Sequence, residues 1–169
     1  MNRLSLKAVV YNPITNAFHS PTRQSFTWSK DVTARACPKC NTDQVNPDCT
    51  CGIYSSPNPA VLTEYARSRN SVYVVLNTFG WDDICLAPED VGPGLVLRSW
   101  GAQIVMAVST ELNGQPLEPQ RQLCMIKLLE NFDITPYPWG MVKTIIKVNW
   151  NQPYLIVKDP YDPEQYKNL

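Results

Sequence analysis

Four cysteines within fifteen residues constrain this chain more than any other feature of its sequence. The pattern is Cys37-Pro-Lys-Cys40, eight intervening residues, and then Cys49-Thr-Cys51-Gly. Zinc in structural sites takes four soft ligands at tetrahedral positions, with thiolates about 2.3 Å from the metal. So short a segment buries too little surface to form a core alone, and a metal link would replace that packing. We therefore predict one structural zinc ion held by Cys37, Cys40, Cys49 and Cys51.

The same four thiols could instead form two disulfides or stay buried as free cysteines. The N-terminus has no sustained apolar stretch of the kind found in secretion signals, so we expect a cytoplasmic, reducing setting that favours thiols. Four thiolates would close the coordination shell of zinc, which makes the predicted site structural. The pattern also differs from that of zinc deaminases, because Ala36 precedes the first pair and no His-x-Glu lies upstream.

Strands are predicted where apolar residues alternate with polar ones or gather in β-branched runs. Proline and Asn-Gly punctuation separates these runs, and Asn113-Gly114 predicts a turn. The expected strands lie within Leu4–Tyr11, Phe18–Trp28, Ser71–Asn77 and Leu95–Ser109.

Two helices are predicted from capping and spacing. Asn58 is a suitable N-cap before Pro59, and the first helix is expected to run to about Arg69. The second is expected from about Glu118 to Asn131, with helical spacing of Leu123, Ile126 and Leu129. Cys124 lies in that stripe and is expected to be buried.

The last apolar stretch, Met141–Trp150, fits either a helix or a strand, and its β-branched residues favour a strand. We predict a zinc-stabilised α+β domain over 1–138, followed by a C-terminal extension and tail over 139–169. The expected fold is a small, mainly antiparallel sheet or partly open barrel with a four-cysteine zinc knuckle and two helices.

The segment Pro47–Tyr54, read as PDCTCGIY, resembles the CxCGIYA motif of small uncharacterised bacterial and phage proteins. The order of elements around it is also similar, and the likeness covers about residues 8–138. Ser55 stands where that family usually has alanine, and Phe132-Asp133 stands where Tyr-Gly is commoner. The resemblance implies a zinc motif in a bacterial or phage-infected cell, and it implies no activity.

A non-catalytic binding module, acting as a subunit or regulator in a protein complex, is the function that we expect. Aromatic and basic residues near the C-terminus are the candidate partner surface, since Trp and Tyr are favoured anchors at interfaces. The alternative is that these aromatic residues cap the core. The candidates are Tyr137, Trp139, Lys143, Lys147 and Trp150.

A nucleic-acid-binding regulator is the alternative function, with Lys30, Arg35 and Lys39 close to the cysteines. A second alternative is an enzyme that uses the acidic loop Asp82–Pro93 to hold a divalent cation. His19 is the single histidine, and no residue pattern nominates a catalytic mechanism. The longest apolar runs are far short of the roughly 20 residues that cross a bilayer, so no membrane partner is expected.

Overall fold

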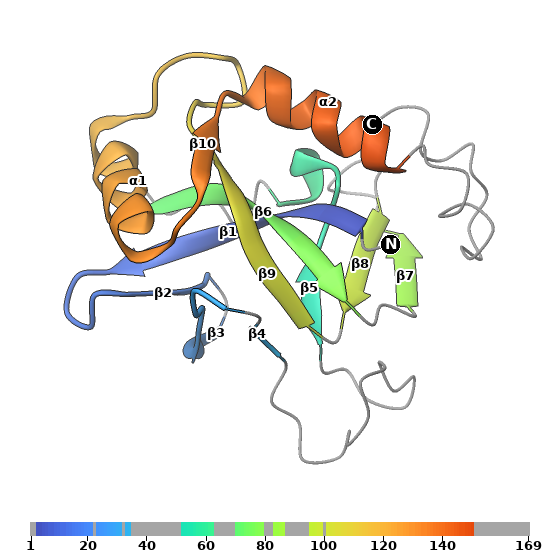
Figure 1. Ribbon diagram of the computed structural model, residues 1–169, viewed down its shortest axis with the longest axis horizontal. Helices are drawn as coiled ribbons and strands as arrows, with labels where there is room; N and C mark the ends of the chain where they lie inside the picture. The colour runs from blue at the N-terminus through green and yellow to red at the C-terminus, as the bar shows by residue number, and fades with distance from the viewer. Residues whose placement is uncertain are drawn as a thin grey trace.

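The computed structural model describes residues 3–21, 23–31, 33–34, 52–62, 70–79, 83–86, 95–99 and 101–150. These residues form ten strands, one 3₁₀ helix (η1) and two α-helices, drawn in Figure 1. In chain order they are β1 Arg3–Asn12, β2 Ala17–Ser20, β3 Arg23–Thr27, β4 Thr33–Ala34, β5 Ile53–Ser55, η1 Pro59–Leu62, β6 Ser71–Phe79, β7 Asp83–Leu86, β8 Leu95–Ser99, β9 Gly101–Val108, α1 Pro119–Asn131, β10 Thr135–Tyr137 and α2 Trp139–Trp150.

The strands build two sheets. The larger has seven strands in the order β10-β9-β6-β1-β2-β3, with β4 paired to β9 as well, and the smaller has the order β5-β8-β7. Only the β10–β9 pair is parallel among the described strands. The predicted class, α+β with a mainly antiparallel sheet and two helices, is confirmed, and the sheet does not close into a barrel. The predicted zinc knuckle falls on residues outside the described ranges.

The central strands β1 and β6 are buried on both faces, because successive side chains of a strand point to opposite sides. Val9 and Val74 belong to a core cluster that includes Cys124, Met125 and Leu128 of α1. Their neighbours Ala8 and Val75 belong to a second cluster with Val142, Ile146 and Trp150 of α2. The two helices therefore cover opposite faces of the sheet.

A β-bulge in β9 changes which of its side chains point to each face of the larger sheet. Its register against β6 shifts between Val75 and Leu76, which leaves Val105 as the extra residue of β9. Ile104 and Ala107, three positions apart, can therefore both join the α1 side of the core. Strict alternation would have sent them to opposite faces. The sequence run predicted as strand over Leu95–Ser109 thus becomes β8 and β9, which lie in different sheets.

The prediction that favoured a strand for Met141–Trp150 is wrong, because this segment belongs to the helix α2. Val142, Ile146 and Trp150 recur every four residues and are all buried, so they form the core-facing stripe of this helix. Trp150 is fully buried, and its indole N–H donates to the carbonyl of Leu4 at 2.6 Å. Packing on the sheet outweighs the local preference of β-branched residues.

The remaining helix predictions are met in part. Asn58 accepts a hydrogen bond from the Ala60 N–H at 3.0 Å, as an N-cap should, but the described part of that element is the 3₁₀ helix η1. Residues 63–69 of the predicted helix lie outside the described ranges. In α1, Cys124 is buried as expected, whereas Leu123 and Ile126 are exposed. The predicted Asn113-Gly114 turn is present, with Gly114 at φ 83°.

We predict that Trp150→Phe lowers the free energy of unfolding by about 2 kcal/mol, because it removes the hydrogen bond to the Leu4 carbonyl and leaves a cavity. The substitution also alters the contact of the Trp150 ring with the Arg3 guanidinium, which lies 4.2 Å from the ring centroid. Urea unfolding followed by circular dichroism measures the change. Val148→Ala is the control, since Val148 is 57% exposed and should cost less than about 0.5 kcal/mol. Equal losses from the two variants would contradict the role of Trp150 in the core.

Candidate functional site

The predicted zinc ligands Cys37, Cys40, Cys49 and Cys51 all lie outside the residues that the structure describes. Within the described ranges, no group of three or more His, Cys, Asp or Glu residues is placed to hold a metal ion. The four-cysteine site therefore stays a prediction from sequence. The structure does describe the residues on either side of the segment, and they constrain its geometry.

Both ends of the cysteine segment are attached to adjacent points of the sheets. On the N-terminal side, Ala34 of β4 pairs with Gly101 of β9. On the C-terminal side, Ile53 of β5 pairs with Ser99 of β8. Ser99 and Gly101 are two residues apart, so the ends lie no more than about 18 Å from each other. Figure 1 shows β4, β5 and the start of β9 gathered at one end of the molecule.

This attachment holds Ala34 and Ile53, the residues that flank the segment, close to each other. Fully extended, the chain from Ala34 to Ile53 could span roughly 65 Å. Sheet pairing instead holds these two residues within a fraction of that length. Bringing the ends of a chain segment together costs conformational entropy, and the sheet pairing already includes this cost, which a four-ligand site would otherwise add. The first cysteine follows Ala34 by three residues, and the last precedes Ile53 by two. Each cysteine pair therefore has one member within three residues, in sequence, of a residue that is paired in a sheet.

Gly52, between Cys51 and β5, is a position that only glycine fits. Its φ of 132° lies in the region that other residues rarely adopt. A Cβ placed there would lie 2.6 Å from Cγ of Arg98, whose side chain is almost completely buried. The Arg98 stem therefore packs directly against the Gly52 backbone. This contact fixes the backbone at Gly52, the residue that directly follows Cys51.

The predicted partner residues are divided between core and surface. Trp150 is fully buried and belongs to the α2 side of the core. Tyr137 and Trp139 are half-buried and pack against the same cluster, and the Trp139 N–H donates to Oγ1 of Thr110 at 3.0 Å. Lys143 is exposed and Lys147 is half-buried. Trp150 therefore fits the alternative in which these aromatic residues cap the core. The two lysines lie on the same side of α2.

The residues behind the other two hypotheses are mostly outside the described ranges. Lys30 is described and exposed, whereas Arg35 and Lys39 are not described. Of the acidic loop Asp82–Pro93, the structure describes only the backbone of β7, which begins at Asp83. His19 lies in β2 with Nδ1 2.9 Å from the carbonyl oxygen of Ser20.

Cys124 is poorly suited to nucleophilic chemistry. Burial raises the pKa of its thiol to about 12, against the smaller opposing effects of a hydrogen bond with the Tyr11 backbone and the Arg121 charge. The nucleophile in cysteine chemistry is the thiolate, which is scarce at neutral pH when the pKa is this high. We assign Cys124 to the core beneath α1.

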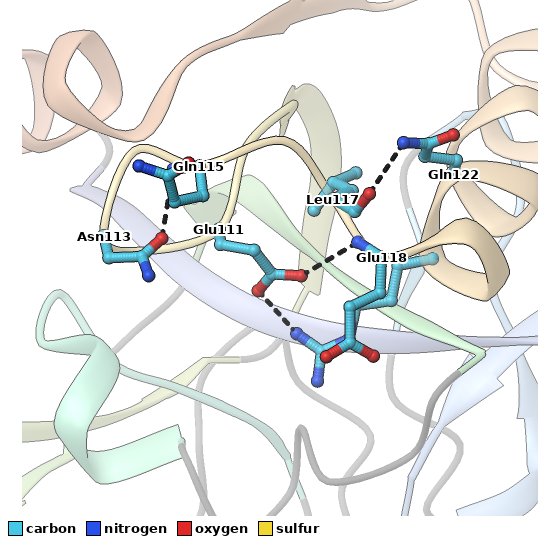
Figure 2. Close-up of polar contacts among 7 residues, drawn as sticks. Glu111, Asn113, Gln115, Leu117, Glu118 and Gln122 are labelled. Carbon is cyan, nitrogen blue, oxygen red and sulfur yellow. Dashed lines mark hydrogen bonds and ion pairs between the residues drawn. The ribbon is translucent and has the colours of Figure 1, made fainter.

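Sequence reasoning missed a polar network at the start of α1, shown in Figure 2. One carboxylate oxygen of Glu111 accepts from Arg121 at 2.8 Å, and the other accepts from the Glu118 N–H at 3.3 Å. Gln122 reaches back to the carbonyl of Leu117 at 2.7 Å. The partners of Glu111 are seven and ten residues away, so no helical or strand spacing could reveal them.

This network fastens the loop that precedes α1 to the start of the helix. Glu118, the N-cap residue of α1, makes no side-chain capping bond, and the distant Glu111 ties down this end of the helix instead. The adjacent cavity, lined in part by Ser71, Tyr73 and Arg121, has a volume of about 10 Å³. That is room for a single water molecule.

No helix in the described part of the chain combines the length and apolar character needed to cross a bilayer.

We predict that Gly52→Ala lowers the free energy of unfolding by about 2 kcal/mol, because the new Cβ meets Arg98 at an unfavourable φ. Gly140→Ala is the matched control, since a Cβ at Gly140 would have no atom within 4 Å. There alanine should be neutral or stabilise α2 by up to about 1 kcal/mol. Denaturant titration of both variants measures the difference. An equally small effect at both positions would contradict the packing of Arg98 on Gly52.

Comparison with protein-family models, with curated proteins and with solved structures found no match for this chain.

Proposed function

We propose that this protein is a zinc-stabilised binding module that acts without catalysis, as a subunit or regulator within a complex, with a protein as its partner. The observation that carries the proposal is the four-cysteine segment, whose two ends are attached two residues apart on β8 and β9. A segment whose flanking residues are held close in this way suits a metal that draws two ligand pairs together. Four thiolates leave zinc no position for water or substrate, so its contribution is to folding.

The setting of the protein is part of the same proposal. A zinc site of four thiolates requires reduced cysteines, which are maintained in the cytoplasm. The PDCTCGIY segment supports a relationship with the CxCGIYA proteins and a bacterial or phage origin. Binding is the proposed role because the predicted zinc is structural and the described residues include the exposed apolar side chains of Met141 and Val148 on α2.

We predict one zinc ion per chain and its loss in the Cys49→Ala, Cys51→Ala variant. Elemental analysis of protein purified without added metal or chelator gives the stoichiometry. The variant should also be less stable, by about 4 kcal/mol at free zinc 1,000-fold above the Kd of the native site. Cys124→Ala is the control, since Cys124 is buried beneath α1 and should not affect the metal content. Native protein that is metal-free yet stable under strong reductant would refute the zinc site.

We also predict a stoichiometric protein partner that stays bound after nuclease treatment. Affinity purification of the tagged chain from its own cells, with and without nuclease, makes the test. Partners that disappear with nuclease would favour the nucleic-acid-binding alternative, in which Lys30 and the basic residues near the cysteines contact phosphate. A chain that purifies with no companion under either condition would contradict the binding function.

A further inference from the structure

We infer that the outer face of α2 is the docking surface for an acidic protein partner that presents an apolar groove; this inference rests on the proposed binding function and names its partner class. The outer face is the side of α2 turned away from the buried residues Val142, Ile146 and Trp150. It combines an apolar edge, a basic edge and a strip of small residues between them.

The apolar edge consists of Met141, Ile145 and Val148. At 3.6 residues per turn these side chains fall within a sector of about 60° on the helix. Met141 is 48% exposed and Val148 is 57% exposed, and Ile145 is half-buried beside them. Their spacing of four and three residues is the pattern with which a helix enters an apolar groove. The apolar side chains of α2 therefore form two stripes, and only one of them is needed by the core.

The basic edge consists of Lys143 and Lys147, one helical turn apart. They lie on the opposite border of the outer face from the apolar edge. The helix contains no acidic residue to neutralise them. A partner that covers this face must therefore supply the negative charge, since charges across an interface are arranged to be complementary.

Small residues lie between the two edges. Gly140 and Thr144 are both exposed, and a Cβ at Gly140 would meet no atom within 4 Å. The Thr144 hydroxyl donates to the Gly140 carbonyl at 3.1 Å. This hydroxyl therefore keeps its acceptor when a partner covers Thr144. A partner could thus approach the α2 backbone closely along this strip.

Charge argues for an acidic protein over the other occupants. Two copies packed antiparallel through α2 would bring their basic edges together, and α2 itself contains no acidic residue to offset them. A parallel pair would set the basic edge of one copy against the apolar edge of the other. Nucleic acid would engage Lys143 and Lys147 but leave the apolar edge without a matching surface. A membrane would need more hydrocarbon than three partly exposed side chains provide, since even a myristoyl chain binds membranes only marginally.

The test uses the nuclease-resistant protein recovered with the wild-type chain, purified and titrated against variants of the outer face. The first variant is Met141→Gln, Val148→Gln; the second is Gly140→Leu, which fills the small-residue strip. The matched control is Leu123→Gln, Ile126→Gln on α1, where the two side chains are 52% and 54% exposed. Both α2 variants should weaken binding at least about tenfold, and the α1 control should change it less than about twofold.

The basic edge is tested by salt. Lys143→Ala, Lys147→Ala should weaken binding about tenfold at roughly 50 mM salt and by much less at roughly 300 mM, because salt screens the charges. Lys30→Ala is the control, since Lys30 is also exposed but lies far from α2 in sequence. All variants change positions that are at least partly exposed, so melting temperatures should stay within about 2 °C of the wild type.

A photo-crosslinking residue in place of Thr144 identifies what covers the face, with the same residue at the exposed Gln120 of α1 as control. The expected product is a partner peptide in which Asp or Glu flanks apolar residues, formed from position 144 only. A crosslink to nucleic acid, to a second copy or to residues 151–169 of the same chain would overturn the inference. So would a partner that binds every α2 variant as well as the wild type, although the binding function would then survive. Recovery of no nuclease-resistant partner at all would overturn both.

Discussion

The antiparallel pairing of β1 with β6 is the interaction on which both faces of the molecule depend. Eight residue pairs, from Arg3–Thr78 to Val10–Ser71, join the two strands at the centre of the larger sheet. Because successive side chains of a strand point to opposite faces, this one pair of strands gives α1 a packing surface on one face of the sheet and α2 a packing surface on the other. Burial on both faces explains the continuous apolar runs at residues 8–11 of β1 and 72–76 of β6. Each helix needs to supply only one apolar stripe, and further apolar residues remain at the surface.

The local pattern of the sequence predicted the elements better than it predicted their roles. Alternation located β1, the run of β-branched residues located β6, and the helical spacing of apolar residues located α1. The conformation of Met141–Trp150 was not predictable from propensity, because the choice between helix and strand depends on packing against β1. In α1 the stripe was misjudged, since Leu123 and Ile126 have the same spacing as core residues and only the orientation of the helix leaves them exposed.

The candidate zinc site also has some features that the sequence shows and others that only the structure shows. The spacing of the four cysteines is visible in one line of sequence, and it remains the basis of the zinc prediction. The proximity of the residues that flank their segment was not visible, because it depends on β4 and β5 pairing with strands more than forty residues away. Gly52 could be noticed in sequence only as a glycine beside a cysteine; its contact with Arg98 gives the physical reason for it. Trp150 looked like an interface anchor and is instead fully buried in the core on the α2 side of the sheet.

X-ray absorption at the zinc edge of the native protein tests the central claim most directly, because it reports the ligands of the metal without requiring a crystal. We predict a single shell of four sulfur neighbours about 2.3 Å from zinc. That result would establish that the segment between β4 and β5 is a four-thiolate structural site. A first shell that contains oxygen or nitrogen at about 2.0 Å would indicate an incomplete or open site, and the absence of a zinc edge would contradict the account altogether.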